Sequence, residues 1–239
     1  MSVKIVDDLD HLYKEAAELF SDLAKESIGQ KGKFVVALSG GSSPKAIFEL
    51  LATKEYSEKI DWTNIYFFWV DERWVPLDDD KSNAKMTFET LLNQVPVTAN
   101  HIYPMYKEGI SPEAYAAEYE NDIRTVLGEE GRFDLILLGM GDDGHTASLF
   151  PGEEILNENE KWVDAYYLAP QEMYRITLTA PIINKAENVL VITFGKSKKS
   201  ALNEVLNGAY NPEFYPLQLI KPEKKDLQIL TTSETLVTV

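Results

Sequence analysis

Short apolar runs alternate with segments of helical periodicity along nearly the whole chain, and this alternation limits the possible folds more than any other feature. Runs typical of buried strands occupy residues 34–38, 65–70, 133–138, 189–194 and 227–230, with two extended segments within 162–179. Apolar residues at helical spacing occupy 7–29, 44–51, 83–93, 112–127 and 197–207. Strands that alternate with helices indicate βαβ units and a largely parallel sheet.

The 239 residues contain no internal repeat, low-complexity tract or long Pro/Gly-rich linker that would divide them. We therefore expect one domain over residues 1–239, with a Rossmann-like α/β fold and helices on both faces of the sheet. The connections near residues 72–82 and 151–172 are long enough to cover a site at the edge of that sheet.

Composition excludes several classes of function. The net charge of −16 argues against nucleic acid as a partner, because binding a polyphosphate needs a basic face. The absence of cysteine excludes disulfides, thiolate metal sites and a cysteine nucleophile. No apolar run approaches the roughly 20 residues that span a bilayer, and the first residues do not resemble a signal peptide. We expect a cytoplasmic protein without membrane contacts; the sequence does not indicate an oligomeric state.

A glycine-rich segment, 139–152, directly follows the apolar run 133–138. It carries Asp143 and His145, separated by one glycine. Ligands of open α/β sheets bind at the carboxyl ends of the strands, where this segment should lie. An Asp can orient an imidazole whose ordinary pKa suits a general base. The alternative is a glycine-rich turn with a solvated histidine.

A second segment, Ser39 to Pro44, lies between an expected strand and an expected helix. Gly40, Gly41, Ser42 and Ser43 would place backbone N–H groups and hydroxyls at a positive helix end, which suits a phosphate. The segment is neither a Walker A loop nor a dinucleotide-binding motif. A serine that merely caps the helix would explain the same residues.

Charged residues follow two further strands. Asp71 and Arg73 stand after the aromatic run 65–70, and an Arg suits a phosphate or a developing oxyanion. Arg175 begins an extended segment, and Lys198 follows the run 189–194. Both are placed to complete an anion site. A surface Asp–Arg pair and a charged helix start are the respective alternatives.

Together these segments resemble the glucosamine-6-phosphate isomerase/6-phosphogluconolactonase family, and within it the lactonases. The matching text occurs in family order over residues 34 to about 202: Ser-Gly-Gly-Ser-Ser-Pro from Ser39, Asp-Glu-Arg from Asp71, the long motif 139–152, Arg-Ile-Thr-Leu-Thr from Arg175, and Gly-x-x-Lys ending at Lys198. The motif that contains His145 is the specific one.

The resemblance implies hydrolysis of 6-phospho-D-glucono-1,5-lactone in the oxidative pentose phosphate pathway. It implies His145 as general base, Asp143 as the residue that orients it, and Arg73 as partner of negative charge on the intermediate or the phosphate. By the same resemblance, residues 40–43 hold the phosphate together with Asp71, Arg175 and Lys198. An activated cyclic ester needs a positioned water, a base and an oxyanion partner, so we expect no cofactor and no metal.

Two alternatives remain. The deaminase/isomerase branch of the family carries Asp-Glu-Tyr where this chain has Arg73 as third residue, and an acidic residue where this chain has Phe150; both differences favour the lactonase. A non-catalytic sugar-phosphate sensor would usually bring a basic DNA-binding segment, which the sequence lacks. Residues 227–232 depart from the family by lacking the Trp and Asp expected near its last strand.

Overall fold

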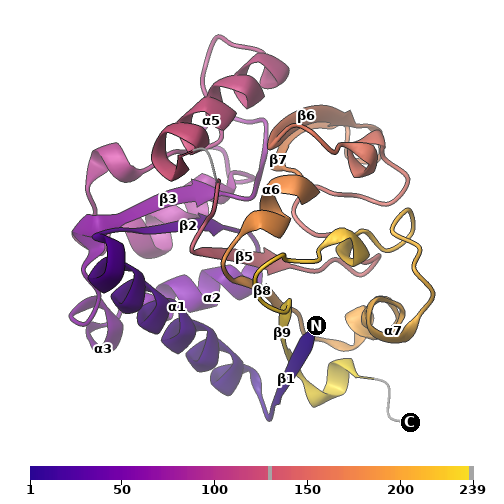
Figure 1. Ribbon diagram of the computed structural model, residues 1–239, viewed down its shortest axis with the longest axis horizontal. Helices are drawn as coiled ribbons and strands as arrows, with labels where there is room; N and C mark the ends of the chain where they lie inside the picture. Colours follow the sequence, from indigo (N-terminus) through magenta and orange to yellow (C-terminus); the bar gives the residue numbers. More distant parts are fainter. Residues whose placement is uncertain (129–130, 237–239) are drawn as a thin grey trace.

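The computed structural model describes residues 1–128 and 131–236, and the strands in these ranges form two sheets (Figure 1). The main sheet has six strands, all parallel, in the order β1-β9-β8-β5-β2-β3. The small sheet has three antiparallel strands in the order β4-β7-β6. The strands are β1 (Ser2–Val6), β2 (Phe34–Leu38), β3 (Ile65–Trp69), β4 (Asp71–Arg73), β5 (Leu135–Gly139), β6 (Val163–Leu168), β7 (Met173–Leu178), β8 (Val189–Ile192) and β9 (Gln228–Thr232).

Helices cover both faces of the main sheet, as the sequence predicts. Successive residues of a strand point to opposite faces. In β3, Phe67 stacks on Trp62, which stacks on Phe20 of α1, whereas the neighbouring Phe68 packs edge-on against Tyr119 of α5. The α-helices of the described ranges are α1 (Leu9–Lys31), α2 (Ser42–Leu51), α3 (Lys54–Ser57), α4 (Asn83–Thr87), α5 (Pro112–Leu127), α6 (Ala180–Lys185) and α7 (Lys199–Asn207). None of these helices is both long and apolar enough to cross a lipid bilayer.

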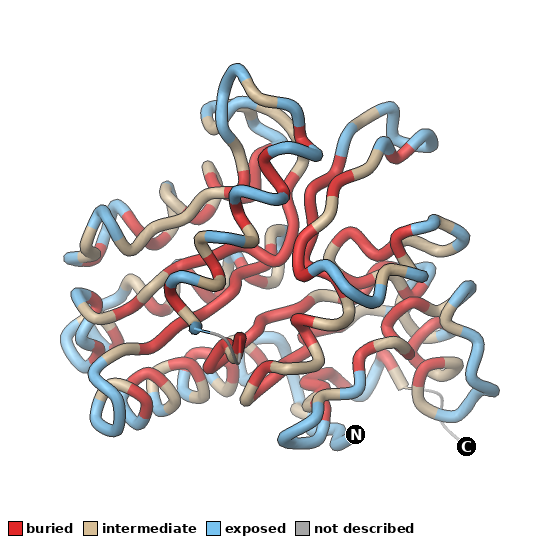
Figure 2. The backbone as a smooth tube through the Cα atoms, turned by 45° about the horizontal axis from the view of Figure 1, so that its top comes forward, coloured by how far each residue is buried: buried red, intermediate tan, exposed pale blue. Residues whose placement is uncertain are grey.

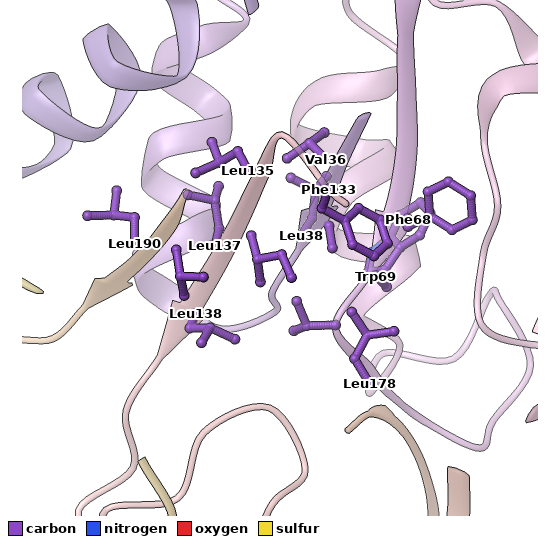
Figure 3. Close-up of a cluster of buried hydrophobic side chains, with 14 of the residues drawn as sticks. Val36, Leu38, Phe68, Trp69, Phe133, Leu135, Leu137, Leu138, Leu178 and Leu190 are labelled. Atoms are coloured by element: carbon purple, nitrogen blue, oxygen red, sulfur yellow. The ribbon is translucent and has the colours of Figure 1, made fainter. Parts of the chain in front are cut away.

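The core follows the strands of the main sheet, where buried backbone dominates in Figure 2. Every residue of β2 and β8 is buried, which explains why these strands are continuous apolar runs rather than alternating ones. Leu38, Leu137 and Phe133 belong to one cluster (Figure 3). Burial of each such side chain stabilises the folded state by about 1.5–3 kcal/mol. The edge of the sheet that carries the polar loops is therefore anchored to a well-packed core.

One residue joins the two sheets. Val70 separates β3 from β4; its N–H donates to the carbonyl of Leu38 (2.9 Å), and its own carbonyl accepts from the N–H of Leu178 (2.7 Å). The first bond extends the main sheet and the second extends the small one. The small sheet therefore begins at the carboxyl edge of the main sheet, and its residues can face the loops that follow β2 and β5.

The elements differ from the sequence prediction in several places. The predicted helix over 83–93 is the short α4 followed by a π-helical turn, Phe88–Leu92. The helices α3 and α6 and the strands β1 and β4 were not predicted. All but the last residue of β1 are exposed, so its alternating side chains give no run typical of a buried strand. The divergent C-terminal segment forms β9, which pairs with both β1 and β8.

Candidate active site

The carboxyl ends of the central strands surround a cavity of about 370 Å³. Asp143 does not line this cavity, but it contacts His145, which does. The other residues that the sequence singles out all line it: Gly40, Gly41, Ser42, Ser43, Asp71, Arg73, His145, Arg175 and Lys198. Segments that are far apart in the chain thus meet in one cavity.

His145 and Asp143 form a close pair in the loop after β5. The imidazole Nδ1 lies 2.6 Å from Oδ1 of Asp143, and the same oxygen accepts the backbone N–H of His145 at 3.0 Å. This contact favours the tautomer with the proton on Nδ1, which leaves the Nε2 lone pair available. The ring of Phe150 stacks on the imidazole, with centroids 4.1 Å apart. The pair is therefore fixed in orientation, unlike a solvated histidine on a turn.

The backbone around this pair is specialised. A Cβ atom on Gly141 would lie 2.0 Å from Nδ1 of His145 and 2.7 Å from Oδ1 of Asp143, so only glycine leaves room for the contact. Ala147 has a φ of 49°, in the left-handed region that residues other than glycine rarely adopt. Strained residues of this kind cluster at functional sites.

The loop before α2 presents an open helix end to the cavity. The N-cap of α2 is Gly41, no side chain caps the helix, and its first turn contains no acidic residue. The interpretation of this segment as a serine cap is therefore wrong. The free N–H groups of the first turn carry partial positive charge, as an anion site requires. Ser39 contributes structurally, because its hydroxyl donates to the carbonyl of Leu137 at 2.7 Å.

Two arginines lie opposite each other on neighbouring strands of the small sheet. Arg73 of β4 is paired with Arg175 of β7. One guanidinium donates to the carbonyl of Lys81 and the other to the side chain of Gln171. Within the described residues, the Nε atom of each arginine is buried without a hydrogen-bond partner. Burial lowers the pKa of Arg175, while the charge of Asp71 opposes that shift. Like charges directly opposite are unfavourable, so this arrangement suits an anionic ligand.

The two acidic residues of β4 have different surroundings. Oδ2 of Asp71 accepts the hydroxyl of Ser148 at 2.7 Å and lies 3.9 Å from a guanidinium nitrogen of Arg175. Asp71 is only 8% exposed, so the interpretation as a surface Asp–Arg pair is wrong. Glu72 is fully buried, and its carboxylate accepts backbone N–H groups at the start of α4. Burial raises the pKa of Glu72, and those hydrogen bonds oppose the rise.

Lys198 lies at the other flank of the cavity, on a 3-10 turn after β8. Its Nζ is 2.5 Å from Oδ1 of Asp142, which also accepts the hydroxyl of Ser197. The hydrogen bond from Lys198 lowers the pKa of Asp142. The Lys198 side chain is thus held beside the His145 loop rather than extended into solvent.

Sequence reasoning missed three polar residues that line the cavity: Asn83, Gln171 and Thr193. The Asn83 amide donates to the backbone carbonyl of Asp71 and lies against Gly40. No short motif marks these residues; only the prediction that residues 72–82 and 151–172 cover the site points near two of them. Among the described residues, no three His, Asp or Glu side chains are grouped so that they could hold a metal ion.

Comparison with known proteins identifies the family of this chain. The family model described as glucosamine-6-phosphate isomerases/6-phosphogluconolactonase matches residues 7–229. A 6-phosphogluconolactonase from Synechocystis sp. is 37% identical over 209 residues, which are 86% of this chain and 85% of the relative.

Solved structures agree with this match. A 6-phosphogluconolactonase from Thermotoga maritima superposes with a TM-score of 0.82 at 27% identity, covering 96% of this chain and 99% of that one. A monomeric glucosamine-6-phosphate deaminase reaches a TM-score of 0.83 at 21% identity, covering 98% of each chain, and shows the shared fold alone. The chain belongs to the glucosamine-6-phosphate isomerase/6-phosphogluconolactonase family.

Proposed function

We propose that this protein hydrolyses 6-phospho-D-glucono-1,5-lactone to 6-phospho-D-gluconate. Relatives that are 34–37% identical over most of the chain carry the name 6-phosphogluconolactonase. The observation that carries the proposal is that one cavity is lined both by His145, which Asp143 orients, and by two arginines that lack partners at Nε. Lactone hydrolysis needs a base for water, and a phosphorylated substrate needs cationic partners.

In this mechanism Nε2 of His145 takes a proton from water as the water oxygen attacks the lactone carbonyl carbon. Asp143 stabilises the resulting imidazolium through Nδ1. Arg73 offsets the negative charge of the tetrahedral intermediate. When the intermediate collapses, the bond from the carbonyl carbon to the ring oxygen breaks, and His145 returns its proton to that oxygen. Each step uses only side chains that line the cavity or contact one that does.

The phosphate would lie against the backbone N–H groups and hydroxyls of residues 40–43, with Arg175 and Lys198 completing the site. Asp71 acts through Arg175, since its carboxylate would repel a phosphate but lies 3.9 Å from the guanidinium.

We also propose that residues 1–239 form one domain, that the protein is cytoplasmic, and that it acts without a cofactor, metal, nucleic acid or membrane. The hydrogen bonds of Val70 to both sheets support the single domain.

The deaminase/isomerase reaction is the second candidate, because the family includes it. Ring opening and proton transfer between carbons need a further acid/base group. Here Phe150 occupies the position where that branch has an acid, and it stacks on His145. A sensor without catalysis is the third candidate; the fixed His145–Asp143 pair favours an enzyme over it.

The test is the rate of lactone loss above spontaneous hydrolysis, without added metal. We expect His145→Ala to lower that rate by about 10²–10⁴-fold, the usual contribution of a general base, while 6-phosphogluconate still binds. His11→Ala is the matched control, because His11 is exposed on α1, outside the cavity. Wild-type turnover by His145→Ala would contradict the assignment of the base, and ammonia release from glucosamine 6-phosphate would favour the deaminase.

A further inference from the structure

Three residues that line the cavity carry a buried polar atom without a hydrogen-bond partner in the described structure: Nε of Arg73, Nε of Arg175 and Oγ1 of Thr193. An anionic substrate accounts for the two arginines. It leaves Thr193, which is 2% exposed, without a role. A buried hydroxyl without a partner is unfavourable in the folded protein, so it requires an explanation.

Other buried threonines of this region are satisfied. The hydroxyl of Thr146 donates to the carbonyl of Gly139 at 2.8 Å, and that of Thr179 donates to the carbonyl of Lys161 at 2.5 Å. Thr177 donates to the carbonyl of Leu178 at 2.9 Å. At each of these three positions the fold supplies a backbone carbonyl that accepts the threonine hydroxyl. Thr193 differs from these residues both in lacking a partner and in lining the cavity.

The position of Thr193 is fixed by the sheet. Its backbone N–H donates to the carbonyl of Leu230 at 3.1 Å, which continues the pairing of β8 with β9. In the main sheet β8 lies beside β5, whose loop carries His145, whereas β3 lies on the far side of β2. Arg73 lies on β4, which follows β3 along the chain, and Arg175 on β7 is paired with Arg73. Thr193 and the arginines thus lie on opposite flanks of the His145 loop, and a substrate between them would meet all three.

We propose that Oγ1 of Thr193 hydrogen-bonds a hydroxyl group of the sugar and makes the site selective for polyhydroxylated lactones; this inference rests on the proposed function. A hydroxyl can donate to and accept from another hydroxyl, and it adds no charge beside the cationic groups. A site that hydrogen-bonds a substrate hydroxyl discriminates strongly against analogues that lack it, because its own polar group is then left unpaired.

The test compares Thr193→Val, which removes the hydroxyl, with Thr193→Ser, which keeps it. We expect Thr193→Val to weaken 6-phosphogluconate binding in calorimetry about tenfold or more, with the Tm of the free protein unchanged or higher. Thr193→Ser should bind within a few-fold of wild type. Among 2-, 3- and 4-deoxy analogues of 6-phosphogluconate, one should bind equally weakly to wild type and to Thr193→Val.

Thr179→Val is the matched control with the opposite expected result. It removes a hydroxyl that has a partner in the fold, so the Tm should fall while binding stays unchanged. Unchanged binding by Thr193→Val would overturn the inference, and so would a lowered Tm, because the hydroxyl would then have its partner inside the fold. Binding of 6-phosphogluconate needs no turnover. An inactive wild type would therefore refute the proposed function separately.

Discussion

At the scale of single residues, the site depends on backbone conformations that few residues adopt. Gly41 has φ 102° and ψ 178°, a region essentially restricted to glycine. This conformation turns the chain from β2 into α2 and leaves the first N–H groups of the helix facing the cavity. The unusual backbone conformation of Gly41 thus produces the open N-terminal end of α2.

We predict that Gly41→Ala lowers the free energy of unfolding by about 1–3 kcal/mol, because alanine is strained at this φ and ψ. It should also weaken binding of 6-phosphogluconate, since the loop must shift to relieve the strain. Urea denaturation and calorimetry measure the two effects. Gly29→Ala is the control: Gly29 is exposed in α1 with free space around its Cα, so alanine should stabilise by about 0.5–1 kcal/mol. Equal stability of Gly41→Ala and wild type would contradict the strain argument.

The sequence identifies the residues whose chemistry is encoded locally. His145 and Asp143 stand two positions apart with the glycine that their contact needs, so a short motif reveals them. Thr193 and Gln171 are different, because what matters is what surrounds them in space. Whether a threonine hydroxyl finds an acceptor depends on strands distant in the chain, and sequence spacing carries no information about that.

At the scale of elements, the short helix α4 depends on a residue of β4. Oε1 of Glu72 accepts the N–H groups of Arg73 and Asn83, and Oε2 accepts the N–H of Ala84 and the hydroxyl of Ser82. These bonds satisfy N–H groups that a helix start leaves free. They also position Asn83 beside Gly40 in the loop before α2, so a structural carboxylate supports the cavity.

We predict that Glu72→Gln lowers the free energy of unfolding by about 1–3 kcal/mol, because the new amide NH₂ faces backbone donors instead of accepting from them. The KM for the lactone should rise as Asn83 shifts. Denaturant titration and steady-state kinetics provide the measurements. Glu89→Gln, exposed and 3.9 Å from Lys85, is the control and should stay within about 0.5 kcal/mol of wild type. A neutral effect of Glu72→Gln would show that α4 forms without this carboxylate.

Elements buried on both faces are predictable, and exposed or irregular ones are not. The continuous apolar runs of β2 and β8 indicate central strands of a parallel sheet. By contrast, β1 is defined by its pairing with β9 rather than by burial. The π-helical turn after α4 retains helical spacing of its apolar residues, so periodicity alone could not separate it from a regular helix.

At the scale of the whole molecule, a chain with a net charge of −16 would bind a substrate that carries a phosphate. Most acidic residues are exposed, whereas Arg73, Arg175 and Lys198 line the cavity. Surface charges are screened by salt over a Debye length of about 10 Å at 0.1 M, while buried groups are screened much less. Salt should therefore weaken the repulsion more than the attraction.

We predict that raising the ionic strength from about 0.01 to about 0.1 M increases kcat/KM for the phosphorylated lactone. Initial rates over a salt series measure this, with spontaneous hydrolysis subtracted. Unphosphorylated glucono-1,5-lactone is the control, because a neutral substrate should show little change. A fall in kcat/KM with salt would mean that attraction by exposed cations dominates the encounter.

The pairing of β1 with β9 has a consequence for how the molecule is made. Ser2 is paired with Gln228 and Val6 with Thr232, so the first strand finds its neighbour only in the last one. On the ribosome, β8 keeps an open edge and β1 stays single until residue 232 has emerged. Contacts of such long sequence separation are slow to form. The sheet is therefore completed after translation of β9, and the unfinished chain presents the open edge of the apolar strand β8 to whatever surrounds it.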